Sequence, residues 1–390
     1  MAVAVPRLEV KAGEEAWTLQ AARGRARTTV SGDAETITAL LHGDLAGVDA
    51  FLSERIRIEG SLALALEMET LFGSGRHPRR WARAGHLTAA GVHTFYLDAG
   101  RPSAGTPPVI LIHGLGGTNA SFLPTLWDQA RNHRVIAPDL PGHGDSGKPI
   151  RTYDAAFYAT WLTAFLDELG LERAHLVGNS LGGRIALEMG IVQPRRVASI
   201  TLLAAAPVVH RLRRLVPVVR LLRPELSLIP LPMLRAHALF AVRGLFARPS
   251  RVPESWFEAA ADEFVRVFRE PGARVAFFSS LREIYLEEPL GRDGYWARLR
   301  QVKAPTLMLW GDRDPLVPGR HAGAVRRALP HATSIMLRDC GHVPQYELPR
   351  EVNRLIRRHL GEVETATMHG TVNRLPHIAS TRAAGAVRTA

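Results

Sequence analysis

Gly-Asn-Ser-Leu-Gly-Gly, residues 178–183, is the stretch that decides the fold of this chain. It follows an apolar run, residues 174–177, and leads into a helix-forming segment that begins at Arg184. Glycines two positions before and two positions after a serine permit a tight turn between a strand and a helix, because a side chain there would collide with the neighbouring backbone. Such a turn forces the serine hydroxyl outward, so Ser180 is the candidate nucleophile.

The partners that a serine nucleophile needs follow it in the chain. They are a histidine base and a carboxylate that orients the histidine. A predicted buried strand, residues 305–310, runs into residues 311–318, which contain Asp312 and Asp314. A second apolar run, residues 334–337, is followed by a loop that contains His342. The sequence therefore places a serine, an aspartate and a histidine, in that order, each after a strand.

A glycine-rich loop precedes these elements. The continuous apolar strand 108–112 is followed by His-Gly-Leu-Gly-Gly, residues 113–117. Its glycines allow the backbone to turn so that the amide of Leu115 points at the oxyanion that develops during acyl transfer. The amide of Leu181, directly after the nucleophile, is expected to supply the second donor.

With these motifs in place, residues from about 92 to 361 resemble the α/β-hydrolase fold proteins. The resemblance also includes the turn Asp-Leu-Pro-Gly-His-Gly-Asp-Ser, residues 139–146. It implies a mostly parallel sheet flanked by helices, with a helical cap, and a reaction that needs no cofactor or metal. It also implies that Ser180 is the nucleophile, His342 the general base and acid, and Asp314 the orienting carboxylate.

Several polar residues near the motifs compete for roles. The family spacing Gly-x-x-Asp-x-x-x-Pro selects Asp314 over Asp312. Asp139 and His143 are interpreted as hydrogen-bonding residues that stabilise a turn. His113 is expected to hold the oxyanion loop in place.

Composition is consistent with an α/β enzyme. The chain has 390 residues, 46% of them hydrophobic, and a net charge of +12 that comes almost entirely from arginine, since lysine occurs only at positions 11, 148 and 303. No zinc-finger or RNA-binding signature accompanies this charge, so no nucleic-acid partner is expected. Cys340 is the only cysteine, which excludes an intramolecular disulfide, and it is interpreted as a small packed residue. With no signal-peptide pattern and no run of eighteen apolar residues, we expect a cytoplasmic enzyme, with peripheral association with a membrane as an option.

A long insertion separates the strand 198–203 from the strand near Thr306, and we expect it to form the cap, at about residues 207–300. Residues 208–223 alternate arginine with aliphatic residues. This pattern fits either cap helices with arginines in water or a basic, apolar lip that lies on an anionic membrane. Two further helices are predicted at 255–269 and 274–287. We expect their aromatic side chains to line a large apolar pocket: Trp256, Phe257, Phe264, Phe268, Phe277, Phe278 and Tyr285.

Residues 1–80 do not belong to the hydrolase pattern. A short helix at 35–43, an alternating strand at 55–60 and a helix at 61–72 are predicted in that order. This succession resembles the carboxyl-terminal part of SCP2-type sterol-carrier domains, over roughly residues 16–73. The helix and further strands with which such domains begin are not predicted here, so lipid binding and a purely structural appendage stay as alternatives.

The remaining segments complete the predicted domain organisation. Residues 73–78 are interpreted as a linker. The hydrolase domain is predicted to span residues 81–361, and residues 362–390 to form a disordered tail.

These observations predict a serine hydrolase that cleaves a small apolar carboxylic ester, such as a lipid or a monoacylglycerol, through an acyl-enzyme. One alternative is a hydrolase of carbon-carbon bonds in ring-cleavage products. The Gly-Asn-Ser sequence at residues 178–180 resembles the elbow of such hydrolases. Another is a lipid-binding carrier whose hydrolase domain is secondary. The N-terminal segment is expected to take no part in the chemistry, because it contains no nucleophile and base pair.

Overall fold

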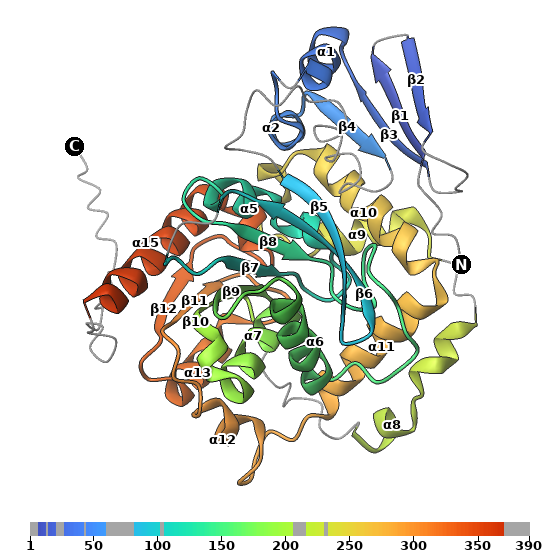
Figure 1. Cartoon of the computed structure of the whole chain (residues 1–390). Helices are drawn as coiled ribbons and strands as arrows, with labels where there is room; N and C mark the ends of the chain where they lie inside the picture. The colour runs from blue at the N-terminus through green and yellow to red at the C-terminus, as the bar shows by residue number, and fades with distance from the viewer. Residues whose placement is uncertain are drawn as a thin grey trace, which may run out of the picture.

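The computed structural model describes residues 7–12, 15–20, 27–42, 44–59, 82–101, 105–205, 216–229 and 233–369. These residues form two sheets, one of four strands and one of eight. Figure 1 shows the small N-terminal sheet at one end of the molecule, above the large sheet and its surrounding helices. The predicted α/β class is confirmed.

The large sheet has the strand order β12-β11-β10-β9-β7-β8-β6-β5. Its strands from β7 to β12 run parallel, whereas β5 and β6 are antiparallel to their neighbours. Every residue of β7, β8, β9, β10 and β11 is buried, as expected of parallel strands that helices cover on both faces. The strands are β5 Ala82–Ala89, β6 Val92–Ala99, β7 Val109–Ile112, β8 Val135–Pro138, β9 Ala174–Asn179, β10 Val197–Leu203, β11 Thr306–Gly311 and β12 Thr333–Leu337.

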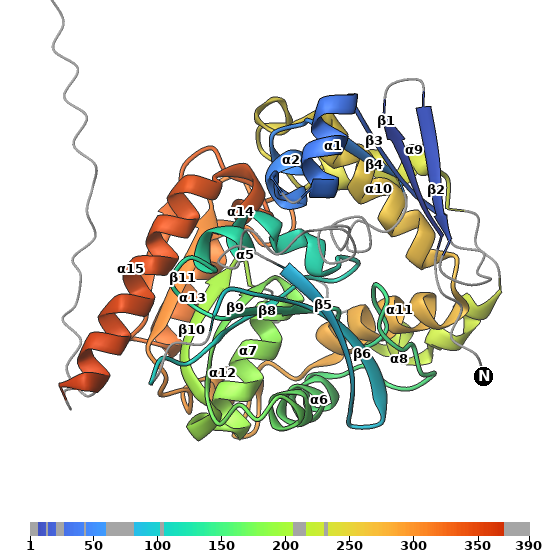
Figure 2. The same cartoon turned by 45° about the horizontal axis from the view of Figure 1, so that its top comes forward.

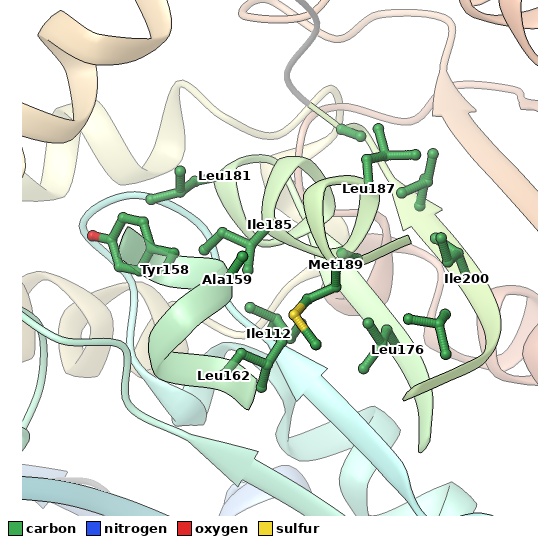
Figure 3. Close-up of a cluster of buried hydrophobic side chains, with 14 of the residues drawn as sticks. Ile112, Tyr158, Ala159, Leu162, Leu176, Leu181, Ile185, Leu187, Met189 and Ile200 are labelled. Atoms are coloured by element: carbon green, nitrogen blue, oxygen red, sulfur yellow. The ribbon is translucent and has the colours of Figure 1, made fainter. Parts of the chain in front are cut away.

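Two apolar clusters cover opposite faces of this sheet, because successive strand residues point to opposite sides. Ile110 and Ile112 of β7 belong to the cluster with α6 and α7, whereas Val109 and Leu111 belong to the cluster with α5 and α15. Figure 3 shows part of the first cluster, in which strand side chains face those of α6 and α7. Outside the cap, the described helices of the hydrolase region are α5 Leu123–Gln129, α6 Ala155–Glu168, α7 Leu181–Val192, α13 Ala322–Ala328, α14 Pro344–Glu347 and α15 Pro349–Met368, with 3-10 turns η1 Asn119–Phe122, η2 Pro194–Arg196 and η6 Gly319–His321.

The predicted helical insertion lies between β10 and β11. Both long helices predicted there are present, and their bounds differ from the prediction by only a few residues. Residues 206–215, which begin the predicted arginine-rich segment, lie outside the described residues. The elements of the insertion are α8 Val216–Leu221, η4 Pro224–Leu228, α9 Arg235–Arg243, η5 Pro249–Arg251, α10 Glu254–Phe268, α11 Pro271–Leu286 and α12 Tyr295–Leu299.

The N-terminal sheet has the strand order β2-β1-β3-β4, with β1 and β3 parallel. The expected short helix and the alternating strand are present as α1 and β4. The expectation that further initial strands are missing was wrong, because three strands precede α1. The predicted helix 61–72 and linker 73–78 lie outside the described residues. The elements are β1 Arg7–Ala12, β2 Glu15–Gln20, β3 Arg27–Gly32, α1 Ala34–His42, α2 Gly47–Leu52 and β4 Ile56–Glu59.

The last helix, α15, extends beyond residue 362, where the tail was predicted to start. It continues through Gly361 to Met368, because Val363 still packs against the core. The Glu364 carboxylate lies 2.8 Å from Nε2 of His133 and 3.5 Å from Nε2 of His175. Burial raises the pKa of Glu364, but the hydrogen bond with His133 and the interaction with His175 together outweigh burial and lower this pKa to about 2. The helix is therefore anchored to the hydrolase body beyond Gly361, and residues 370–390 lie outside the described residues.

Candidate active site

Ser180 lies on a strained turn between β9 and α7. Its backbone has φ 53° and ψ −113°, a conformation that a residue other than glycine rarely adopts. A Cβ atom on Gly182 would lie 1.9 Å from the carbonyl oxygen of Ile112, and one on Gly178 would lie 2.3 Å from the backbone of Gly182. Both glycines are therefore required by close backbone approach, for the reason that the sequence indicated.

The aspartate that meets the histidine is Asp314. Its Oδ2 lies 2.8 Å from Nδ1 of His342, and its Oδ1 accepts hydrogen bonds of 2.8 Å from the amides of Leu316 and Val317. Asp314 is buried, so its carboxylate is held in one orientation by the loop after β11. Asp312 is exposed and accepts a bond from the amide of Cys340, which leaves it on the outside of the same loop.

Asn179 joins the elbow to the histidine loop. Its side-chain amide donates hydrogen bonds of 3.0 Å to the carbonyl oxygens of Leu203 and His342. The residue directly before Ser180 therefore fixes the backbone of His342 against the end of β9. This role of Asn179 is not evident from the sequence, in which the residue is marked only by its place in Gly-Asn-Ser.

A second residue that the sequence reasoning missed is Glu347, in α14. Its buried carboxylate accepts backbone hydrogen bonds from Gly341 at 2.7 Å, Arg248 at 2.6 Å and Ala247 at 3.2 Å. The amide of His342 donates to the carbonyl of Leu245 at 2.7 Å. The loop that carries the histidine is therefore tied to the cap segment before α10.

The glycine-rich loop lies against the nucleophile. A Cβ atom on Gly114 would lie 3.3 Å from Cβ of Ser180, and the amide of Gly117 donates to the carbonyl of Gly114 across a turn that contains Leu115. Leu181 is the first residue of α7, so its amide has no acceptor within the helix. Helix N-termini attract negative charge. The segments that carry both predicted oxyanion donors therefore lie next to Ser180, and the donor role of the two amides stays a prediction.

His113 holds this loop, as predicted. Its Nε2 accepts a hydrogen bond of 2.9 Å from the amide of Leu140, and its Nδ1 lies 2.8 Å from the carbonyl oxygen of Gly114. Burial lowers the pKa of His113 to about 3, so its ring is neutral at physiological pH. The neutral ring must then carry its proton on Nδ1, where it donates to Gly114.

The turn after β8 contains the other polar residues singled out from the sequence. Asp139 accepts hydrogen bonds from the amides of Asn119 at 2.7 Å and Asp145 at 2.8 Å. Burial, aided by the charge of Asp145, raises the pKa of Asp139 to about 7. His143 is buried, and its Nδ1 lies 3.1 Å from the carbonyl of Pro141. The interpretation of both residues as supports of the turn fits these contacts.

An aromatic cluster from the cap lies over the glycine-rich loop. A Cβ atom on Gly116 would lie 2.9 Å from a ring carbon of Phe264 and 3.2 Å from one of Phe277. Phe268 and Phe278 pack on these rings, with centroids 5.1 to 6.1 Å apart. We call these four phenylalanines the phenylalanine cluster.

Two residues expected in the same pocket contact other parts of the protein. Trp256 stacks on Phe51 of the N-terminal sheet region, and Phe257 packs edge-on against Phe246. Trp256 and Phe257 lie about two turns before Phe264 on α10, and these contacts place them outside the phenylalanine cluster.

A serine elbow after a central parallel strand, with an aspartate and a histidine after later strands, defines the class of α/β hydrolases. The chain belongs to the alpha/beta hydrolase fold family, which matches residues 107–349. Residues 5–73 match the SCP-2 sterol transfer family, which confirms the N-terminal resemblance. Among the described residues, no helix is long and apolar enough to cross a membrane, and no cluster of side chains is suited to a metal ion.

Characterised relatives of the hydrolase region have different activities. An acetyltransferase component of an acetoin cleaving system from Cupriavidus necator is 30% identical over 67% of this chain, and the match spans 65% of that relative. A 2-hydroxy-6-oxononadienedioate/2-hydroxy-6-oxononatrienedioate hydrolase from Pseudomonas putida is 27% identical over 67% of this chain and 89% of its own length. The crystal structure of a membrane phospholipase A superposes with a TM-score of 0.62 and 26% identity, covering 85% of this chain and 99% of that one.

Proposed function

We propose that this protein is a serine hydrolase that cleaves apolar carboxylic esters, with a lipid or monoacylglycerol as the substrate class. The observation that carries this proposal is the phenylalanine cluster, which lies directly over Gly116 in the same loop whose Gly114 lies against Ser180. An acyl chain placed against these rings would bring its ester carbonyl to Ser180. The similarity to a membrane phospholipase A supports the same substrate class.

In the proposed reaction, Ser180 Oγ attacks the ester carbonyl carbon while Nε2 of His342 takes the hydroxyl proton. The amides of Leu115 and Leu181 stabilise the oxyanion of the tetrahedral intermediate. His342 then gives its proton to the leaving alcohol, and the acyl-enzyme forms. Water attacks this ester while His342 takes its proton, and His342 then gives the proton to Ser180 Oγ as the acid is released. Asp314 keeps the proton on Nδ1 of His342 throughout, through their 2.8 Å contact.

The expected result of the test is a rise in kcat/KM with acyl length across a series of nitrophenyl esters. Each methylene that is buried against the phenylalanine cluster contributes about 0.8 kcal/mol, which is about fourfold in kcat/KM, until the pocket is full. Phe264→Ala should flatten this rise and leave the rate on acetate much less changed. A flat or falling profile in the unaltered protein would contradict the proposed substrate class.

A second candidate activity is the hydrolysis of a carbon-carbon bond in a dienone ring-cleavage product. The Gly-Asn-Ser sequence at the elbow and the relative from Pseudomonas putida favour it. In the same assays, turnover of a dienone substrate with little turnover of all the nitrophenyl esters would favour this reaction. Absence of turnover of both substrate types would favour a lipid carrier.

We further propose that the substrate reaches the site from an anionic membrane surface, through a face that we call the cap lip, residues 216–229. Its exposed apolar side chains are accompanied by exposed Arg220 and Arg223 and by a single acidic residue, Glu225. Arg274 and Arg282 of α11 hold the backbone of the lip through hydrogen bonds to its carbonyl oxygens. The exposed apolar residues are Val218, Leu221, Leu222, Leu226, Leu228 and Ile229.

Leu221→Glu is expected to weaken binding to phosphatidylglycerol vesicles by about tenfold. Leu221 is 81% exposed, so it is available to insert into a bilayer, and the change both removes apolar area and adds repulsion from anionic lipid. Vesicle co-sedimentation measures the effect. Val192→Glu, at the end of α7, is the matched control, because this exposed valine lies outside the cap lip. Equal losses in both variants would contradict a role for the lip.

A further inference from the structure

The N-terminal module, residues 7–59 as described, packs against one end of cap helix α10. Figures 1 and 2 show β4 and the neighbouring α2 lying beside this helix in both views. The rings of Phe51 and Trp256 are stacked, with centroids 6.1 Å apart and planes inclined by 19°. The indole of Trp256 also donates a hydrogen bond of 3.3 Å to the carbonyl oxygen of Phe51.

This contact is part of a continuous apolar core. Phe51 and the buried residues of β3 and β4 belong to the same cluster as Ala259 of α10 and the strands of the hydrolase sheet. Arg57 and Glu258 form an ion pair of 3.1 Å at the rim. The module is therefore docked on the cap through buried apolar surface, which is the largest source of stability in such contacts.

Trp256 also contacts the segment that follows His342. Its ring packs edge-on against Tyr346, with centroids 5.1 Å apart, and the Tyr346 hydroxyl donates a hydrogen bond of 2.6 Å to the carbonyl of Ala120. One tryptophan thus joins the N-terminal module, the cap and the hydrolase body.

The other end of α10 reaches the glycine-rich loop of the site, where Phe264 lies against Gly116. Phe264 lies eight residues after Trp256, which is about 12 Å along a helix. At this end of α10, the buried Glu263 pairs with Arg266. Arg266 also donates a hydrogen bond to Asp145 of the turn after β8. Because α10 is one unbroken helix from Glu254 to Phe268, a shift at Trp256 would move Phe264 over Gly116.

We propose that the N-terminal module acts as a clamp on α10 and thereby sets the acyl-chain selectivity of the active site. Phe51 and Trp256 are positioning residues in this proposal, since they act through Phe264 and Phe268. The expected effect on selectivity rests on the proposed ester hydrolysis, whereas the restraint of α10 by the module does not depend on the substrate. The module would thus influence selectivity, although it contains no nucleophile and base pair of its own.

The test compares Phe51→Ala with Phe51→Leu in the full chain. Phe51→Ala should reduce the ratio of kcat/KM for the octanoate and acetate nitrophenyl esters by about fourfold or more, the equivalent of one lost methylene contact. The effect should appear mainly in KM for the long ester, because the nucleophile is untouched. Phe51→Leu, which keeps most of the apolar volume, should restore most of the ratio. Arg57→Ala, which removes only the exposed rim pair, should change the ratio by less than about twofold.

Hydrogen exchange supplies the readout that does not depend on ester hydrolysis. Amides of α10 should exchange faster in Phe51→Ala than in the unaltered protein, while those of β9 and α7 stay protected. Exchange of the β1 and β3 amides reports whether the module itself stays folded. If the module unfolds in Phe51→Ala, Trp256→Phe replaces it, since this variant keeps a ring but loses the bond to Phe51.

The outcomes separate this proposal from the proposed function. Unchanged α10 exchange in a variant that breaks the contact would overturn the clamp, whatever the substrate is. Faster α10 exchange with equal loss on both esters would overturn the link to selectivity. Faster α10 exchange in a protein that hydrolyses no ester would support the clamp and reject ester hydrolysis alone.

Discussion

Ser180→Ala is expected to lower kcat on a nitrophenyl ester by about four to six orders of magnitude, because nucleophile, base and carboxylate act as one unit. The variant should also lose covalent labelling by a fluorophosphonate. The fold should persist, since alanine has the same backbone preferences as serine at φ 53° and the side chain of Ser180 is not part of the buried core. Thermal unfolding is the control, and labelling of the alanine variant would show that another residue is the nucleophile.

The features that were predictable from the sequence are those with a local cause. The glycines around Ser180 are required by contacts within a few ångströms of the turn, and they leave a fixed spacing in the chain. The strands before Asp314 and His342 are buried or paired in a parallel sheet, and they appear in the sequence as short apolar runs. Because these requirements act between residues close in the chain, the fold class and the candidate site residues could be predicted from the sequence.

The features that the sequence did not reveal depend on residues that are far apart in the chain. Asn179 contacts the carbonyl of His342, 163 residues later, and Glu347 binds the amide of Ala247, 100 residues earlier. Neither side chain belongs to a periodic pattern that would mark its partner. The stacking of Trp256 on Phe51 spans the two domains in the same way. Positioning contacts of this kind become visible only when the chain is folded.

The N-terminal strands and the end of the last helix were missed for a different reason. β1 and β3 are short and rich in polar residues, yet Val10 and Val30 are buried at alternate positions and hold the sheet to its helices. Gly361 suggested a helix end, but tertiary contacts of Val363 and Glu364 carry α15 past it. In both cases packing outweighs local preference.

The second large effect on kcat is expected at Asp314, the aspartate that contacts His342. Asp314→Asn is expected to lower kcat by about 10⁴, the scale seen when an orienting carboxylate becomes an amide and the histidine is held in the wrong tautomer. The 2.8 Å contact with Nδ1 of His342 is the physical reason, since an amide nitrogen there would donate where a carboxylate accepts. The loop should keep its shape, because the remaining oxygen still accepts from Leu316 and Val317.

Asp312→Asn is the matched control for this experiment. Asp312 is exposed, and its carboxylate accepts a hydrogen bond of 3.3 Å from the amide of Cys340, which an asparagine oxygen can also accept. We expect its kcat to stay within about twofold of the unaltered protein, since single surface changes of this kind have small effects. Steady-state kinetics of the two variants on the same ester decide the assignment. A large loss in Asp312→Asn with a small one in Asp314→Asn would reverse it, because the contact of Asp314 with His342 would then have no catalytic consequence.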